Sequence, residues 1–335
     1  MKDCPYICPL SKGELHSGNS GLAGVGGERY SYLLNIDSHN QIPVFIDESN
    51  LSSGDRISRT MYEKDDSEFV YENFLSWLFE TFSIEEAKFR SALVEKLELE
   101  QGDRVLVTGC GLGDDIRFIA SKVGEMGEIF AQDISDVMIV ATARRLAASD
   151  VRPFDLNSLY LSVSNASMLP YEDSYFDAAF HFGGINLFSD VKSALSEMTR
   201  VVKVGGKVLI GDEGVAPWLK EKEYGKAAIC NNDLWAMEPP LSLLPENAAN
   251  VHLTWVLGNC FYVIDFDVSD KIPFMNMNVP HRGKRGGSML KRYYGKIDGI
   301  DPELKERVEL EAMMAGLSIN EWVESVVTKG LTKKA

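Results

Sequence analysis

Three glycines, Gly109, Gly111 and Gly113, stand at alternate positions directly after the apolar run at residues 105–107. A buried strand that ends in such a turn is typical of a nucleoside-binding site, because glycine lets the backbone bend tightly and approach a ligand closely. A dinucleotide-binding loop has the pattern G-x-G-x-x-G, and this chain has Asp114 where the third glycine would stand. The loop therefore favours a nucleoside cofactor other than a dinucleotide.

Asp133 directly follows the next predicted strand, residues 129–132. In an α/β sheet, a carboxylate at the end of the strand beside a glycine loop can accept hydrogen bonds from both hydroxyls of a ribose. A strand, a glycine loop, a helix, a second strand and an acid thus follow one another in the order that suits such a ligand. These residues predict a ribonucleoside site.

Two later motifs extend this pattern. The first is a block similar to D-A…L-P…F-D, formed by Asn165-Ala166, Leu169-Pro170 and Phe176-Asp177. The second is R-V-V-K-V-G-G-K at residues 200–207, similar to an R-V-L-K-P-G-G turn. With the glycine loop and Asp133, these motifs resemble the class I S-adenosylmethionine-dependent methyltransferases over roughly residues 60–268. The resemblance implies an α/β fold, a Rossmann-like seven-stranded sheet with a terminal antiparallel hairpin, with small appendages at the two ends.

The resemblance also implies S-adenosylmethionine as the cofactor. The three glycines are expected against its amino-acid end, Asp133 against its ribose and Asn165 against its adenine. Further cofactor-binding candidates, at positions around these motifs, are Cys110, Ile134, Ala166, His181, Gly183 and Tyr62.

Two positions depart from the family's pattern. The acid that usually stands two residues before the first glycine is Val107 here, and Asp114 or Asp115 is the candidate to replace it. The family's adenine-reading Asp is Asn165, whose side-chain carbonyl can still accept a hydrogen bond from an exocyclic amine. We therefore expect the adenine contact to survive.

Candidate catalytic residues stand at the ends of the fourth and fifth predicted strands, residues 176–180 and 207–211. Ligands of open α/β sheets collect outside the carboxyl ends of the strands, which places His181 and Glu213 near the transferred methyl group. His181 is the leading general base, because an imidazole titrates near neutral pH, and Glu213 is the alternative. A strand-end histidine is as often a hydrogen-bonded wall residue, and methyl transfer needs mainly proximity and alignment.

Composition limits the partners of this chain. Its 335 residues include 34 Lys and Arg against 50 Asp and Glu, and the net charge of −16 makes nucleic acid an unlikely partner. Five scattered cysteines and an N-terminus without an apolar run predict a cytoplasmic protein. No apolar stretch approaches the roughly 18 residues that a transmembrane helix requires, so no membrane partner is expected.

Residues 1–50 are expected to form a separate module. The segments C-P-L-S-K-G at residues 8–13 and I-P-V at residues 42–44 resemble the C-P-x-C-K-G…I-P-V pattern of small zinc-ribbon-like domains. Ser11 stands at the second cysteine, the later cysteine pair is absent, and Cys4, Cys8, His16 and His39 lack the paired spacing of a zinc site. We therefore expect a degenerate zinc-ribbon-like module without a metal.

The methyltransferase domain is expected at residues 51–269, with a substrate insertion at residues 214–250. Trp218, Tyr224 and Trp235 in this insertion are candidates either to line an acceptor pocket or to pack in the core. The chain lacks the N-P-P-Y, D-P-P-Y and Pro-Cys motifs that the resemblance would require for methylation of nucleobases. A small-molecule acceptor is therefore favoured.

Residues 270–335 are expected to form a basic linker and a tail. The linker carries Arg282, Lys284, Arg285, Lys291, Arg292 and Lys296 without an intervening acid. Asp301-Pro302 and the capping box from Ser318 to Glu321 predict two helices, each with an apolar stripe. The tail resembles the ribbon-helix-helix fold of small bacterial repressors, which implies a homodimer through this segment. The ribbon near residues 292–297 alternates poorly, which puts DNA recognition in doubt.

Three functions from different classes remain open. The first is S-adenosylmethionine-dependent methyl transfer, by in-line displacement, to a small molecule such as a natural product or another metabolite. The second is methylation of RNA, protein or peptide recruited by the terminal modules, and the third is a DNA-binding regulator that senses the cofactor. The sequence identifies neither the acceptor nor the acceptor atom.

Overall fold

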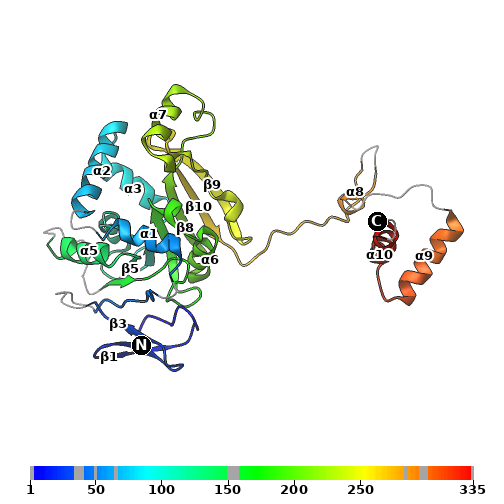
Figure 1. The fold of residues 1–335 in the computed structure, drawn as a ribbon, viewed down its shortest axis with the longest axis horizontal. Coiled ribbons are helices and arrows are strands. Elements are labelled where there is room, and N and C mark those ends of the chain that lie inside the picture. Colours follow the sequence, from blue (N-terminus) through cyan, green and yellow to red (C-terminus); the bar gives the residue numbers. More distant parts are fainter. Residues whose placement is uncertain are drawn as a thin grey trace. The chain divides into compact units, whose positions relative to one another are not determined.

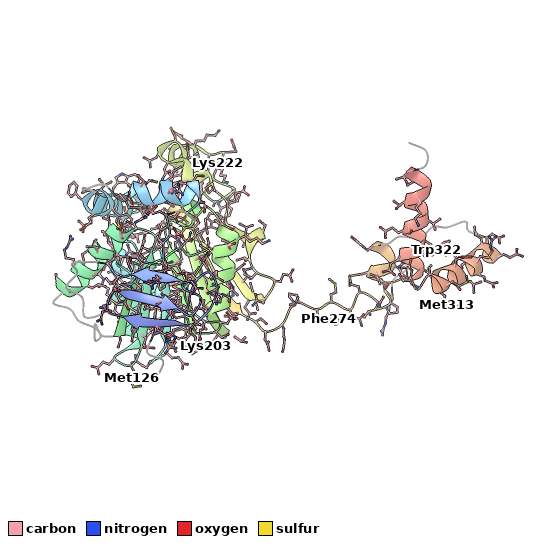
Figure 2. The ribbon with its side chains drawn as sticks, turned by 60° about the horizontal axis from the view of Figure 1, so that its bottom comes forward. Met126, Lys203, Lys222, Phe274, Met313 and Trp322 are labelled. Atoms are coloured by element: carbon pink, nitrogen blue, oxygen red, sulfur yellow. The ribbon has the colours of Figure 1, made fainter. Side chains whose placement is uncertain are left out.

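The computed structural model describes residues 4–33, 41–48, 51–63, 67–148, 158–282, 286–293 and 301–332. The chain divides into two compact units, Met1–Pro273 and Phe274–Ala335, each of which is described by itself. The first unit holds the large sheet and its helices, and the described residues of the second unit form the helices α8, α9 and α10 (Figure 1). In Figure 2, Met126 and Lys222 label opposite ends of the first unit, and Phe274, Met313 and Trp322 belong to the second.

A seven-stranded sheet with the order β6-β5-β4-β7-β8-β10-β9 forms the centre of the first unit. The strands are β4 (Arg104–Thr108), β5 (Glu128–Asp133), β6 (Leu159–Val163), β7 (Phe176–Phe182), β8 (Val202–Glu213), β9 (Ala248–Val256) and β10 (Phe261–Val268). β4 to β8 pair in parallel, while β10 runs antiparallel to both β8 and β9. The predicted fold class, a Rossmann-like sheet with a terminal antiparallel hairpin, is confirmed.

Helices cover both faces of this sheet. They are α1 (Ser53–Met61), α2 (Ser67–Phe82), α3 (Glu86–Glu95), α4 (Ile116–Val123), α5 (Asp136–Ala148), α6 (Val191–Val201) and α7 (Glu223–Asn231). Val105 and Val107 pack under α2 to α5, while Leu106 between them faces the opposite side, where α6 packs. A strand buried on both faces is expected to be apolar throughout, which is why β4 shows an unbroken apolar run.

The N-terminal module shares a core with the large sheet. Its strands β1 (Leu15–Gly18), β2 (Gly21–Gly24) and β3 (Arg29–Ser31) form a small antiparallel sheet. Tyr6 and Phe45 are buried against Phe130 of β5. The expectation of a separate module is therefore corrected, because these apolar side chains complete the core of the large sheet.

The same module covers the edge of the sheet at β6. Val44 pairs in parallel with Val163, the Phe45 amide donates to the Val163 carbonyl at 2.8 Å, and the Val163 amide donates to Pro43 at 2.9 Å. An uncovered edge strand presents unpaired backbone groups that invite aggregation. Residues 43–45 therefore protect the edge strand β6.

Metal ligands were not expected in this module, and its cysteines have other contacts. The Cys8 thiol accepts a hydrogen bond from the Ser11 amide at 3.3 Å and lies 3.2 Å from the Tyr30 hydroxyl. Within the described part of the chain, no three His, Cys, Asp or Glu side chains are grouped as metal ligands. His39 lies outside the described residues.

The second unit contains α8 (Met289–Tyr293), α9 (Pro302–Met314) and α10 (Ile319–Thr332). Asp301 caps α9 by accepting from the Glu303 amide at 2.8 Å, and Ser318 and Glu321 exchange hydrogen bonds at the start of α10. Both predicted helices are therefore present. The start of the predicted ribbon lies in α8, while residues 294–297 lie outside the described residues. Among the described helices, none has the length and apolar composition to cross a membrane.

Candidate cofactor and active site

The glycine loop joins β4 to α4 at the carboxyl edge of the sheet. Gly109, Gly111 and Gly113 have φ angles of 56°, 53° and 77°, in the left-handed region that side chains disfavour. A Cβ on Gly113 would lie 2.8 Å from Thr142, and one on Gly109 would lie 3.0 Å from His181. Both the backbone conformation and the space around it therefore require glycine here.

Asp133 holds this loop in place from the end of β5. Its Oδ2 accepts a hydrogen bond from the Gly111 amide at 3.0 Å, and its Oδ1 accepts from the Ser135 amide at 2.9 Å. Burial raises the pKa of Asp133, and the two backbone donors oppose that shift. Each carboxylate oxygen keeps a further lone pair, so the carboxylate can bind a ribose while it orders the loop.

Asp114 and Asp115 belong to a buried ion-pair network. Arg90 on α3, whose side chain is 4% exposed, donates to Asp115 at 2.8 Å and lies 3.8 Å from Asp114. Arg145 on α5 pairs with Asp114 at 3.0 Å. Since two arginines match these charges, the acids tie the start of α4 to α3 and α5. The structure does not support the idea that either acid replaces the one missing at Val107.

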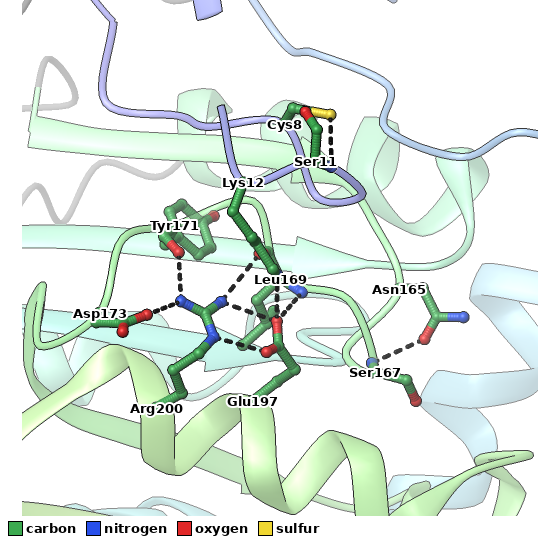
Figure 3. Close-up of polar contacts among 10 residues, drawn as sticks. All are labelled: Cys8, Ser11, Lys12, Asn165, Ser167, Leu169, Tyr171, Asp173, Glu197 and Arg200. Carbon is green, nitrogen blue, oxygen red and sulfur yellow. Dashed lines mark hydrogen bonds and ion pairs between the residues drawn. The ribbon is translucent and has the colours of Figure 1, made fainter. Parts of the chain in front are cut away.

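Asn165 lies on the loop after β6. Its Oδ1 accepts from the Ser167 amide at 2.9 Å, a contact drawn in Figure 3. Its Nδ2 donates to the carboxylate of Asp55 on α1 at 3.1 Å. The side chain is thus oriented on both sides, with its amide nitrogen toward α1.

Charged residues brace the remainder of this loop (Figure 3). Glu197 on α6 accepts from the Leu169 amide at 2.8 Å, and Arg200 donates to the Tyr171 carbonyl at 2.8 Å. Lys12 of the N-terminal module bonds Glu197 at 2.9 Å and the Leu169 carbonyl at 3.3 Å. The loop that carries Asn165 is therefore held from both α6 and the N-terminal module.

The other cofactor candidates lie along the same edge. The Cys110 amide donates to the Gln132 carbonyl at 3.0 Å, and burial raises the pKa of its thiol. The Gly183 amide donates to the Gly211 carbonyl at 2.9 Å, with φ 85° at Gly183. Ile134 stands between Asp133 and Ser135, and Ala166 is buried beside Asn165.

His181 is buried beneath the glycine loop. Its Nδ1 lies 2.8 Å from the Thr108 carbonyl, so Nδ1 carries the proton and donates it, while Nε2 has no hydrogen-bond partner among the described residues. Burial lowers the pKa of His181, and nearby Asp212 opposes that shift. Because the imidazole of His181 is 0% exposed, it does not reach a methyl acceptor. The structure therefore favours a hydrogen-bonded structural role for His181 over the role of a general base.

Asp212 and Glu213 end β8 as a buried acidic pair. Asp212 accepts from the amides of Gly184 at 3.1 Å and Asn186 at 2.6 Å. Burial and the hydrogen bond to Asp212 raise the pKa of Glu213 to about 10. Glu213 is therefore protonated at neutral pH, and its predicted role as a base is not supported in this state.

Tyr62, just after α1, faces this edge of the sheet. Burial, with the charges of Asp133, Glu213 and Asp212, raises the pKa of Tyr62 to about 12. Tyr62 and Tyr71 pack on Leu112 of the glycine loop. The segment from α1 to α2 therefore covers the loop, and Tyr62, Asp133 and Glu213 lie around a common site.

The aromatic side chains of the insertion do not converge on a pocket. Trp235 is buried in the core against Phe82 and Phe261. Trp218 is 58% exposed against Trp255, and the Tyr224 hydroxyl donates to the Gly258 carbonyl at 2.9 Å. Of the two alternatives that the sequence left open, core packing therefore holds for Trp235, while Trp218 and Tyr224 contact the terminal hairpin.

A cavity of about 610 Å³ lies at the opposite edge of the sheet. Tyr6 and His16 of the N-terminal module line it together with Arg104 and Glu128, the first residues of β4 and β5. The glycine loop and Asp133 lie at the far ends of those two strands. The cavity is therefore separate from the candidate cofactor site.

Sequence reasoning missed two residues of the site. Asp55 contacts Asn165, and Tyr71 lies beside Gly111. An acid in the first turn of a helix and a tyrosine in an amphipathic helix are ordinary features. No sequence pattern distinguished them, because the tertiary fold alone brings these side chains to the edge of the sheet.

A solved structure with the same fold defines the class of this unit. Phosphoethanolamine N-methyltransferase 2 of Haemonchus contortus, solved with S-adenosyl-L-methionine, aligns with a TM-score of 0.50 and 16% identity over 77% of this chain and 71% of that chain. The strand order, the glycine loop and this likeness show the fold of a class I methyltransferase domain, as the sequence predicted.

Within this class, residues 78–214 match the ubiE/COQ5 methyltransferase family. The demethylmenaquinone methyltransferase of Bacillus mycoides is 33% identical over 121 residues, 36% of this chain and 49% of that protein. The ubiquinone/menaquinone biosynthesis C-methyltransferase UbiE of Chromobacterium violaceum is 37% identical over 109 residues, 32% of this chain and 42% of that protein. The chain spans about half the length of the curated relatives it matches.

The raised pKa of Glu213 predicts a pH-dependent stability. Between its unfolded pKa of about 4.3 and its folded pKa of about 10, the folded state holds one proton more than the unfolded state. The free energy of unfolding therefore falls as pH rises through this interval. Glu213→Gln carries no such proton, so its stability relative to the wild type should increase from pH 5 to pH 9 in urea denaturation. Glu223→Gln, exposed on α7, is the control. If the stability difference from the wild type is independent of pH for both variants, the raised pKa of Glu213 is contradicted.

Proposed function

We propose that this protein transfers the methyl group of S-adenosylmethionine to a small-molecule acceptor. The observation that carries the proposal is the carboxyl edge of the sheet, where the glycine loop, Asp133 and the Asn165 loop lie together under Tyr62. Gly109, Gly111 and Gly113 all have left-handed backbone angles, and a Cβ on Gly109 or Gly113 would also be crowded by His181 or Thr142. The loop therefore keeps the tight glycine turn that a nucleoside cofactor can approach closely. The residues present therefore fit S-adenosylmethionine.

The chain's own residues act mainly by positioning. Asp133 would bind the ribose hydroxyls, the glycine loop the amino-acid end and the Asn165 loop the adenine. When bound, the sulfonium supplies an electrophilic methyl group for in-line displacement. Tyr62 and Tyr71 cover the loop and exclude water there. Such a reaction depends on proximity and alignment more than on a base.

His181 and Glu213 are assigned supporting roles. His181 keeps its proton on Nδ1, bonded to the Thr108 carbonyl, and so orients the end of β4 before the glycine loop. Glu213 stays protonated beside Asp212, so that two neighbouring buried carboxyl groups do not both carry a negative charge. Neither residue needs to accept a proton from the substrate.

The acceptor class rests on several observations. The family match at residues 78–214 ends before the insertion and the terminal hairpin, so it covers the cofactor half of the domain and does not identify the acceptor. The relatives named above are quinone-biosynthesis enzymes, which act on small molecules. The net charge of −16 opposes an RNA substrate. These observations favour a small molecule over RNA, protein or peptide.

The second unit is proposed to form a homodimer with a second copy of this chain. Its helices α9 and α10 expose large apolar side chains: Leu304, Leu310, Met313, Met314, Leu317, Ile319, Val326, Val327 and Leu331. An apolar surface of this extent on a short helical pair is typical of an interface. The rival occupant is the methyltransferase unit of the same chain. Lys284 and Arg285, basic residues of the linker that are candidates for contact with DNA phosphates, lie outside the described residues.

Removal of the Asp133 carboxylate should weaken cofactor binding. Asp133→Ala removes the ribose acceptor and frees the Gly111 amide, so the dissociation constant for S-adenosylmethionine in titration calorimetry should rise at least tenfold, about 1.4 kcal/mol. Asp136→Ala, in the first turn of the following helix, is the control. An unchanged affinity in Asp133→Ala would remove this residue from the ribose.

Transfer of label should identify the acceptor class. The protein incubated with methyl-labelled S-adenosylmethionine and a metabolite extract should label the small-molecule fraction, and heat-denatured protein should not. Parallel reactions contain total RNA or total protein in place of the metabolites. Label that accumulates only in RNA or in protein would contradict the small-molecule proposal.

Truncation should separate assembly from catalysis. The chain ending at Asp298 lacks α9 and α10, so it should be a monomer by light scattering, while the full chain has twice the mass of one protomer. The truncated chain should still bind S-adenosylmethionine. A dimer that persists after truncation would place the interface elsewhere, and a monomeric full chain would favour docking onto the same chain.

A further inference from the structure

Asp55 on α1 is a buried carboxylate that directly contacts the predicted adenine-binding loop. It is 8% exposed and accepts two side-chain hydrogen bonds. Its Oδ2 accepts from Asn165 Nδ2 at 3.1 Å, and its Oδ1 accepts from the Ser189 hydroxyl at 2.7 Å. Asp55 thus connects α1 to the loops that follow β6 and β7.

This contact explains the residue type at position 165. The family that this chain resembles has an Asp there, and a second carboxylate beside Asp55 would place two like charges within hydrogen-bond distance. An asparagine instead donates its amide hydrogen to Asp55. The charge is therefore retained at this place in the fold but comes from α1 instead of the loop after β6.

We propose that Asp55 is the acidic residue that recognises the 6-amino group of the cofactor's adenine. The inference rests on the proposed function, because it concerns the same S-adenosylmethionine site. Two of the four lone-pair positions of the carboxylate are used by Asn165 and Ser189, which leaves acceptor capacity for an amine. A hydrogen bond from an amine to a buried carboxylate is stronger than one to a neutral amide.

The position of α1 supports this role. Ser52 caps the helix by accepting from the Asp55 amide at 3.0 Å, which fixes the backbone of Asp55. The Ser58 hydroxyl donates to the Leu187 carbonyl at 2.9 Å, and Arg59 pairs with Glu48. Tyr62, directly after the same helix, lies close enough to Asp133 for that carboxylate to help raise its pKa. One short helix therefore reaches from the adenine loop to the ribose carboxylate.

A change of the base tests the contact directly. The probes are S-adenosylhomocysteine and S-inosylhomocysteine, whose 6-oxo group accepts a hydrogen bond instead of donating one. The wild type should prefer the adenine ligand by at least fiftyfold in titration calorimetry. In Asp55→Asn the side chain can donate, so this preference should fall at least tenfold. Ser189→Ala is the matched control, since it removes a hydrogen bond from Asp55 but leaves the carboxylate, and it should keep the preference within threefold.

Exchange of the two side chains is the second test. Asn165→Asp places two carboxylates together and should weaken S-adenosylhomocysteine binding at least tenfold at pH 8, while Asp55→Asn with Asn165→Asp should restore the affinity to within threefold of the wild type. Thermal unfolding of each variant reports whether the fold is intact.

The outcomes separate this inference from the proposed function. A wild type that binds S-adenosylhomocysteine, with the same base preference in Asp55→Asn as in Ser189→Ala, would overturn the role of Asp55 and leave the proposed function standing. If the double variant folds but does not recover affinity for S-adenosylhomocysteine, the claim that Asp55 supplies the charge expected at position 165 is contradicted. A wild type that binds neither ligand would overturn both.

Discussion

The buried carboxylate of Asp133 is the interaction on which the site depends. It binds the Gly111 amide and the Ser135 amide, so one side chain ties the glycine loop after β4 to the start of α5. Burial disfavours its ionised form, and the backbone donors compensate. The glycines of this loop take left-handed backbone angles, and these contacts help to hold the loop in that shape. The positions proposed for ribose and methionine follow from that constraint.

The carboxyl edge of the sheet carries several acids, and each is stabilised differently. Asp212 accepts from backbone amides, and Glu213 keeps its proton because burial and Asp212 raise its pKa. Asp55 is bound by an amide and a hydroxyl group from two loops. An acidic edge of this kind complements the positive charge of a sulfonium. The N-terminal module contributes at a distance, since Lys12 braces the loop that carries Asn165.

The glycine loop and Asp133 could be predicted because they follow from local rules, and the seven-stranded sheet followed from the family resemblance that these motifs carry. Parallel strands buried on both faces are apolar, and a tight turn at a nucleoside requires glycine. The capped helices of the tail were predictable for the same reason, since Asp301 and Ser318 act within a few residues of their own positions. The sequence left open whether Trp235 lines an acceptor pocket or packs in the core, because its side chain suits both roles and only packing distinguishes them.

The sequence by itself determined the class of the domain and the edge at which its cofactor is expected. The tertiary structure decided what each charged group does there. His181 and Glu213 have side chains suited to a base, yet the imidazole of His181 is fully buried and burial keeps the carboxyl group of Glu213 protonated. Asp55 is distant from Asn165 in the chain and adjacent to it in the fold. A protonation state and a contact between remote segments depend on the surrounding dielectric and on distance, and neither quantity is encoded in local sequence.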